Sequence, residues 1–128
     1  MAVSSNTLHE DAADLSAKTR DVHRALVSLQ EELEAVDWYR QRAEACRDGE
    51  LREVLLHNMR EEIEHAAMVL EWLRRSDPDF QEHLSTYLFT EGSILEAEEA
   101  ATSGEGGDAT PSEEAPAGLT LGSLKEES

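Results

Sequence analysis

Residues 51–75 read LREVLLHNMREEIEHAAMVLEWLRR, and the spacing within this stretch decides the fold. One set of positions recurs at alternating steps of four and three, as side chains do along one face of a helix that packs against another helix. We call this set the seam, and its members are Leu51, Leu55, Asn58, Glu62, His65, Val69 and Trp72. The stretch therefore predicts a long helix from about residue 51 to 75.

The residues before this stretch repeat the same spacing over an even longer run. The positions at these steps are Leu8, Ala12, Leu15, Thr19, Val22, Leu26, Leu29, Leu33 and Val36. Asp48 and Gly49 interrupt the pattern, and we expect Gly49 to adopt a left-handed conformation at the end of the first helix. Two long helices joined by so short a break predict an antiparallel hairpin.

The chain after residue 75 changes character twice. Asp77 and Pro78 are typical of the start of a helix, and Ser93 to Ala101 suit one or two further helical turns. Beyond Thr102 the residues are mostly small, acidic or Pro, which indicates a flexible linker. We therefore predict an all-α protein with a flexible start (1–7), a helical domain (8–98), a disordered linker (99–118) and a C-terminal segment (119–128).

The net charge limits the classes of partner. The 128 residues carry a formal charge of -18, and the first ninety contribute 19 acidic and 10 basic side chains to it. Such a surface disfavours nucleic acid and anionic membranes and suits cations. The sequence contains no run of about 18 apolar residues, which a membrane-spanning helix would need. The single cysteine, Cys46, fits a reducing compartment. We expect a cytosolic protein, or one enclosed in a cytosolic compartment.

The seam holds polar side chains where apolar ones are expected. Glu62 and His65 are three residues apart, which places a carboxylate and an imidazole on the same face of the helix. A carboxylate buried between helices costs several kcal/mol unless something compensates for it. Carboxylates with an imidazole form the ligand set of non-haem iron, with manganese and zinc as competitors. The alternative is a solvated ion pair on a Glu-rich helix.

One chain carries half of a di-iron site. Such a site in a four-helix core takes a Glu from each of two helices and a Glu-x-x-His pair from each of the other two. A two-fold dimer would supply the second half. Counting equal rises from the turn places 31–35 opposite 62–65, and Glu32 lies about 40° from Val36 around the helix, so we expect Glu32 to be the missing ligand.

Other polar or aromatic side chains lie near the expected ligands. Tyr39 is two turns from Glu32. It is either a core residue or a hydrogen-bond donor to a ligand carboxylate of the partner. Two acidic or His-containing sets suit either weak cation sites or solvated faces. These sets are Glu31 with Glu34, and His57 with Glu61 and Glu64.

Four segments closely resemble the encapsulated ferritins, which are cargo proteins of bacterial encapsulin nanocompartments. They are EELEAVDWY (31–39), HNMREEIEHAAM (57–68), LEWLRR (70–75) and YLFTEG (87–92). The resemblance implies that Glu32, Glu62 and His65 of two subunits bind two iron ions per subunit pair, beside Tyr39. It also implies a metal entrance with Trp38 as its gate, and a peripheral metal site. The entrance residues would be Glu31 and Glu34, and the peripheral residues His57, Glu61 and Glu64.

The same resemblance implies a function and an assembly. Members of this family oxidise Fe(II) as ring-shaped decamers of five dimers, and the mineral accumulates inside the encapsulin shell. The segment LTLGSLK (119–125) is similar to the peptide that docks them to the shell, with Leu119, Leu121, Gly122 and Leu124 as its motif. The expected location is therefore the bacterial cytoplasm, inside an encapsulin nanocompartment. The alternatives are an iron chaperone or buffer without turnover, and a structural helical cargo adaptor.

Overall fold

The computed structural model describes residues 7–107, which form two compact units that divide after Ser76. The first unit contains the short 3-10 helix η2 (Ala12–Asp14) and the long helices α1 (Ala17–Ala45) and α2 (Gly49–Ser76). The second contains α3 (Pro78–Tyr87) and α4 (Ile94–Gly107). Residues 7–107 include no β-strand, so the predicted all-α class is confirmed for this part of the chain.

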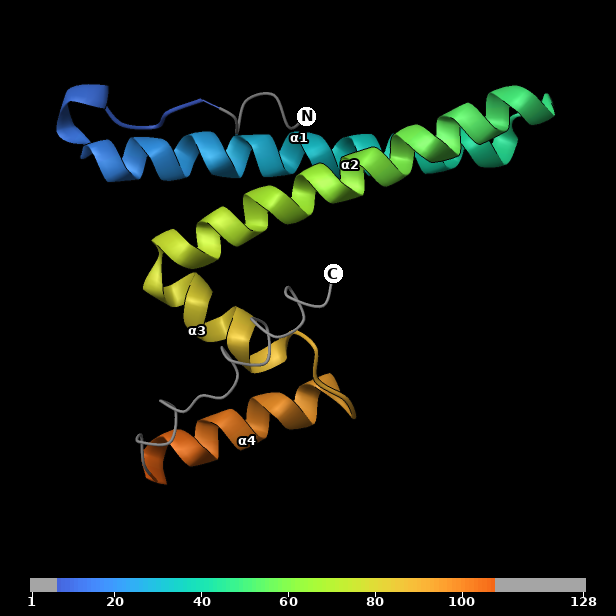
Figure 1. Ribbon diagram of the computed structural model, residues 1–128. Helices are drawn as coiled ribbons and strands as arrows, with labels where there is room; N and C mark the ends of the chain where they lie inside the picture. The colour runs from blue at the N-terminus through green and yellow to red at the C-terminus, as the bar shows by residue number, and fades with distance from the viewer. Residues whose placement is uncertain (1–6, 108–128) are drawn as a thin grey trace. The chain divides into compact units, whose positions relative to one another are not determined.

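Helices α1 and α2 pack side by side in opposite directions, as the predicted hairpin requires (Figure 1). The turn between them is fixed by Asp48, whose Oδ1 accepts the backbone N–H of Leu51 at 2.8 Å. Asp48 therefore caps the start of α2, and satisfies one of its unpaired N–H groups. The prediction for Gly49 was wrong, because Gly49 is the first residue of α2 and does not have a positive φ.

The start of α1 also differs from the prediction. We expected helical packing from Leu8, whereas α1 begins at Ala17, after its N-cap Ser16. The Ser16 hydroxyl accepts the N–H of Thr19 at 3.0 Å, which favours a helix start at this point. The preceding segment folds back, and Arg20 donates hydrogen bonds to the carbonyls of Ala12 and Leu15. The regular spacing before Ser16 is therefore not helical packing.

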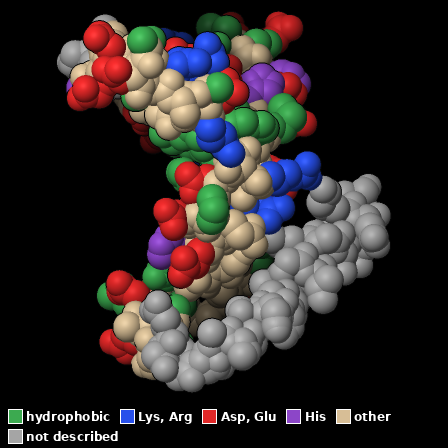
Figure 2. All heavy atoms as spheres, turned by 90° about the vertical axis from the view of Figure 1, so that its left-hand side faces the viewer, with side chains coloured by type: hydrophobic (Ala, Val, Ile, Leu, Met, Phe, Trp, Pro, Cys, Tyr) green, Lys and Arg blue, Asp and Glu red, His purple; other side chains and the backbone are tan. Residues whose placement is uncertain are grey.

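The hairpin has a thin core. Its buried side chains are Ala43 on α1 and Met59, Ala66 and Leu73 on α2. The three α2 residues are seven apart and form a buried line one residue further along the chain than Asn58, His65 and Trp72 of the seam. The seam itself is half-buried or exposed along its length, and hydrophobic side chains lie at the surface among charged ones (Figure 2). The seam is therefore turned partly away from α1.

The second unit begins at a well-formed cap. Asp77 Oδ1 accepts the N–H groups of Asp79 and Phe80 at 2.8 and 3.2 Å, and Pro78 is the first residue of α3. This confirms the predicted helix start. Phe89 and Gly92 then adopt positive φ angles of 65° and 86° in the connection to α4. Phe89 is a bulky residue in a conformation that glycine adopts more readily.

Helix α4 is longer than the sequence indicated. It continues to Gly107, so the first nine residues of the predicted linker (99–118) are helical. The Ala and Glu residues at 96–101 are strong helix formers and outweigh the glycines that follow them. The remaining linker and the C-terminal segment (119–128) lie outside the described residues. Among the described helices, none is long and apolar enough to span a membrane.

Candidate metal centre

Three half-buried side chains from the two long helices converge beside the contact between α1 and α2. His65 Nδ1 lies 3.5 Å from an Oε1 of Glu62, one turn earlier on α2, and 3.6 Å from Oε1 of Glu32 on α1. One ligand atom from each of the three residues lies within 4.8 Å of the other two. Within residues 7–107, no other group of three Asp, Glu, His or Cys side chains has ligand atoms this close together. The structure therefore brings together the three residues that the sequence predicted as ligands.

The electrostatics of this cluster favour a cation. The pKa of Glu32 is raised above its usual value, mainly because its carboxyl shares a hydrogen bond with Glu62. Burial and repulsion from the Glu62 carboxylate raise this pKa further, while His65 opposes the shift. Two carboxylates this close to each other disfavour carrying both negative charges, so a bound cation would stabilise them. Hard oxygen donors with one imidazole nitrogen suit iron, and the donor set fits such an ion.

The cluster is partly open to solvent. The side chains of Glu32 and Glu62 are 25% and 24% exposed, and that of His65 is 43% exposed. A metal ion held by one such set would have few protein ligands and several free coordination positions. The geometry therefore suits either labile binding by one chain or completion by further side chains.

The predicted peripheral residues are only partly assembled. His57 Nε2 lies 3.8 Å from Glu61 Oε2, and the other oxygen of Glu61 lies 4.0 Å from His65 Nε2. Glu64 instead lines a groove on the outer side of α2. In the described part of the chain, these three residues do not form a compact ligand group, so the peripheral site stays a prediction.

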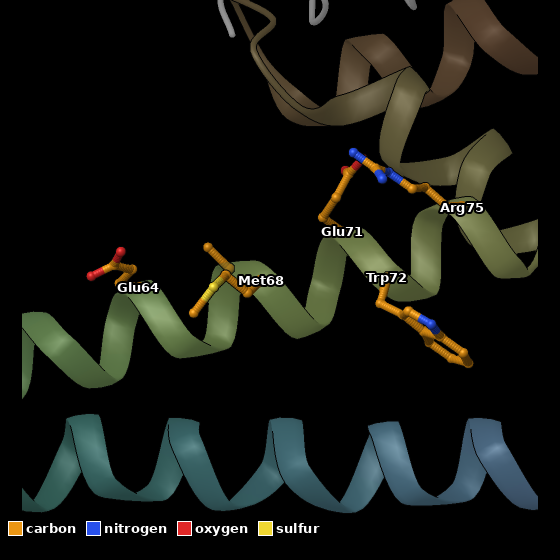
Figure 3. Close-up of a pocket in the computed structure, with 6 residues that line it drawn as sticks. Glu64, Met68, Glu71, Trp72 and Arg75 are labelled. Atoms are coloured by element: carbon orange, nitrogen blue, oxygen red, sulfur yellow. The ribbon is translucent and has the colours of Figure 1, made fainter. Parts of the chain in front are cut away.

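The groove on α2 combines apolar and charged walls. It is lined by Glu64, Ala67, Met68, Glu71, Trp72 and Arg75. Trp72 projects toward the side of α1, while Glu71 and Arg75 meet on the other side of the helix (Figure 3). Glu71 also pairs with Arg74 at 2.7 Å, and this hydrogen-bonded contact is the largest of the effects that lower its pKa to about 2. We call this feature the α2 groove.

The aromatic residues near the cluster contact a side chain that the sequence analysis missed. The guanidinium of Arg42 lies 5.4 Å from the centroid of the Tyr39 ring and 6.0 Å from that of Trp38. A cation at these distances is attracted to the faces of aromatic rings. The spacing of Arg42, three and four residues after the two aromatics, was the available signal. Glu31 is exposed and Glu34 half-buried on the same helix, outside the three-residue cluster.

Comparison with known proteins gives consistent relatives. The EncFtn-like family model matches residues 7–91. The chain is 56% identical to the encapsulated ferritin-like protein of Rhodospirillum rubrum, over 99% of this chain and 94% of that protein. It is 34% identical to the encapsulin nanocompartment cargo protein EncC of Myxococcus xanthus, over 77% of this chain and 80% of that protein. The crystal structure of protein ne0167 from Nitrosomonas europaea is similar, with 57% identity and a TM-score of 0.66 over 68% of this chain and 96% of that one.

Proposed function

We propose a function for this chain, which belongs to the EncFtn-like family. The chain acts as a ferroxidase, which oxidises Fe(II) to Fe(III) with oxygen at a centre completed by two copies of the chain. The observation that supports this most directly is the convergence of Glu32, Glu62 and His65 from α1 and α2 within 4.8 Å. It is an oxygen-rich set with one imidazole, which is the chemistry of non-haem iron sites.

A second copy is needed for a complete centre. One chain supplies two carboxylates and one imidazole, whereas two iron ions in a helical core use twice that number. A two-fold axis beside the cluster would bring the same residues of a partner onto the other side of the site. Exposed apolar side chains on the hairpin support such contact, because Leu33, Ile63 and Trp72 are each at least 40% exposed.

The ligands favour the oxidised product. Fe(II) is the substrate, with two ions per subunit pair, and anionic carboxylates bind Fe(III) more strongly than Fe(II). This preference assists the loss of an electron to oxygen. Glu31, Glu34 and Trp38 of α1 are proposed to form the entrance for Fe(II), which the acidic surface attracts. The hydroxyl of Tyr39 is proposed to reach a ligand carboxylate of the partner and hold its orientation.

The chain is further proposed to deliver iron for storage inside an encapsulin shell, as a ring-shaped decamer of five dimers. The support is its similarity to a relative named as an encapsulin nanocompartment cargo protein and to another named as encapsulated. The motif LTLGSL (119–124), which lies outside the described residues, is proposed to dock to the shell. The proposed location is the bacterial cytoplasm, inside this compartment.

Oxygen consumption tests the proposal directly. Glu32→Ala, Glu62→Ala and His65→Ala should each abolish the oxygen consumption that Fe(II) stimulates, whereas Glu53→Ala, at an exposed position of α2, should retain it. Activity that survives in any two of the first three variants refutes the site. Stoichiometric Fe(II) binding without repeated turnover would instead indicate an iron buffer. Normal assembly with neither binding nor oxidation would indicate a structural cargo adaptor.

A further inference from the structure

The ring of His65 lies between two carboxylate environments. Its Nδ1 faces inward, 3.6 Å from Glu32 and 3.5 Å from Glu62. Its Nε2 faces outward, 4.0 Å from Oε1 of Glu61, one turn earlier on α2. A histidine side chain on a helix points back toward the preceding turn, which places it between the residues three and four positions before it. The two nitrogens of His65 therefore meet different partners because of the helix itself.

The two nitrogens must differ for the inner one to bind a metal ion. A neutral imidazole carries one proton, so only the nitrogen without it offers a lone pair to the ion. For Nδ1 to be the ligand, the proton must lie on Nε2, and a hydrogen-bond acceptor on that side favours this tautomer and fixes the ring. Among the described residues, the carboxylate that lies 4.0 Å from Nε2 is that of Glu61.

We propose that Glu61 is a positioning residue for His65. Its carboxylate accepts the Nε2–H of His65 and holds Nδ1 toward the metal position that Glu32 and Glu62 share. The inference rests on the proposed function, since it assumes that the cluster binds Fe(II). The separation of 4.0 Å is beyond direct hydrogen-bond distance, so the proposed contact requires a rotation of the Glu61 side chain or one bridging water. Glu61 binds no metal in this role.

His57 supports the same arrangement from the other side. It lies four residues before Glu61, and its Nε2 is 3.8 Å from Oε2 of Glu61. The two oxygens of Glu61 therefore face different imidazoles. Glu61 and His57, which were predicted to belong to a peripheral metal site, would then have a role that needs no second metal ion. A cation that recruited Glu61 to a peripheral site would withdraw it from His65.

Anaerobic Fe(II) affinity, measured by competition with a chromogenic chelator, separates positioning from simple loss of charge. Glu61→Ala removes the acceptor and one charge, and should weaken binding about tenfold, at the lower end of the effect of such supporting partners. Glu61→Gln removes the same charge but keeps an amide oxygen that accepts the Nε2–H. Glu53→Ala is the matched control, since it removes an exposed charge of α2 that belongs to no candidate metal site. The Fe(II) affinities of Glu61→Gln and Glu53→Ala should both stay within about threefold of that of the wild type.

A double-mutant comparison gives an independent readout. In a His65→Ala background, Glu61→Ala should have no further effect on Fe(II) affinity. Equal affinities for Glu61→Ala, Glu61→Gln and Glu53→Ala would overturn the positioning role alone. Failure of the wild type to bind Fe(II) would instead overturn the proposed function.

Discussion

Replacing Glu62 by glutamine should stabilise the metal-free protein while it abolishes Fe(II) oxidation. Without a cation, Glu62 and Glu32 repel each other, and this repulsion is among the effects that raise the pKa of Glu32. A glutamine at 62 keeps the shape of the side chain and donates an N–H to the Glu32 carboxylate. The same change removes one of the anionic ligands that the proposed centre requires. Stability and activity are therefore expected to move in opposite directions.

The size of the gain follows from the geometry of the cluster. Ligand oxygens of the two carboxylates lie within 4.8 Å of each other, where two unit charges repel by about 0.9 kcal/mol in water and about 3.5 kcal/mol at an effective dielectric constant of 20. Both side chains are about one quarter exposed, and His65 offsets part of the repulsion. We expect a net gain of about 1 kcal/mol, or roughly 4–8 °C in the melting temperature of a small domain.

The gain should also depend on pH in a defined direction. The raised pKa of Glu32 means that the folded protein holds a proton which the unfolded chain has released. Wild-type stability is therefore lost as the pH rises through the folded-state pKa, and the advantage of Glu62→Gln grows over the same interval. Below the unfolded-state pKa of Glu32 the contribution of its raised pKa is fully present, and the advantage of Glu62→Gln should be smallest.

Thermal and urea unfolding in the presence of EDTA, at a fixed protomer concentration, measures the effect. Glu53→Gln is the control, because it makes the same chemical change at an exposed position of α2 outside the ligand cluster. Fe(II) should raise the melting temperature of the wild type and of Glu53→Gln, but not that of Glu62→Gln. The reasoning is refuted if Glu62→Gln gains no more metal-free stability than Glu53→Gln does.

Three further changes test other parts of the chain. Leu73→Ala removes a side chain that is 0% exposed and should cost about 2–5 kcal/mol of unfolding free energy, measured by urea denaturation. Glu71, with its pKa lowered to about 2, stabilises the folded state above its unfolded-state pKa, and this contribution is lost as the pH falls toward 2. Glu71→Gln should flatten that acid limb by about 0.5–1 kcal/mol in acid titrations of stability, a modest amount because the Glu71 side chain is 37% exposed. Ending the chain at Gly118 should leave Fe(II) oxidation unchanged but abolish co-purification with a co-expressed encapsulin shell.

Residue spacing predicted the two long helices because their contacts repeat regularly over many turns. It failed at the ends of helices, where single side chains decide the outcome. The Ser16 hydroxyl starts α1 after the apolar spacing has begun, and Asp48 starts α2 where a glycine-ended helix was expected. At α4, helix-forming Ala and Glu residues outweighed the glycines that indicated a linker. Such local competitions leave no periodic signal.

The ligand cluster was predictable for the same reason as the hairpin. Equal rises from the turn place Glu32 opposite Glu62 and His65, and the structure brings the three together. The contacts of Arg42 with Trp38 and Tyr39 were not predicted, because the spacing of three and four residues only permits them and side-chain rotamers decide whether they form. The two-sided surroundings of His65 also escaped prediction, since neighbouring carboxylates on a Glu-rich helix look alike in sequence.

The offset between the seam and the buried line explains how one helix serves two contacts. Met59, Ala66 and Leu73 face α1 and form the core of the hairpin, whereas Asn58, His65 and Trp72 lie one residue earlier. One residue corresponds to about 100° around a helix, so the second line lies outside the core, along the edge of the contact with α1. That edge holds half-buried ligands beside exposed apolar side chains. If two copies complete the centre as we propose, their association and the assembly of the metal centre would be a single equilibrium.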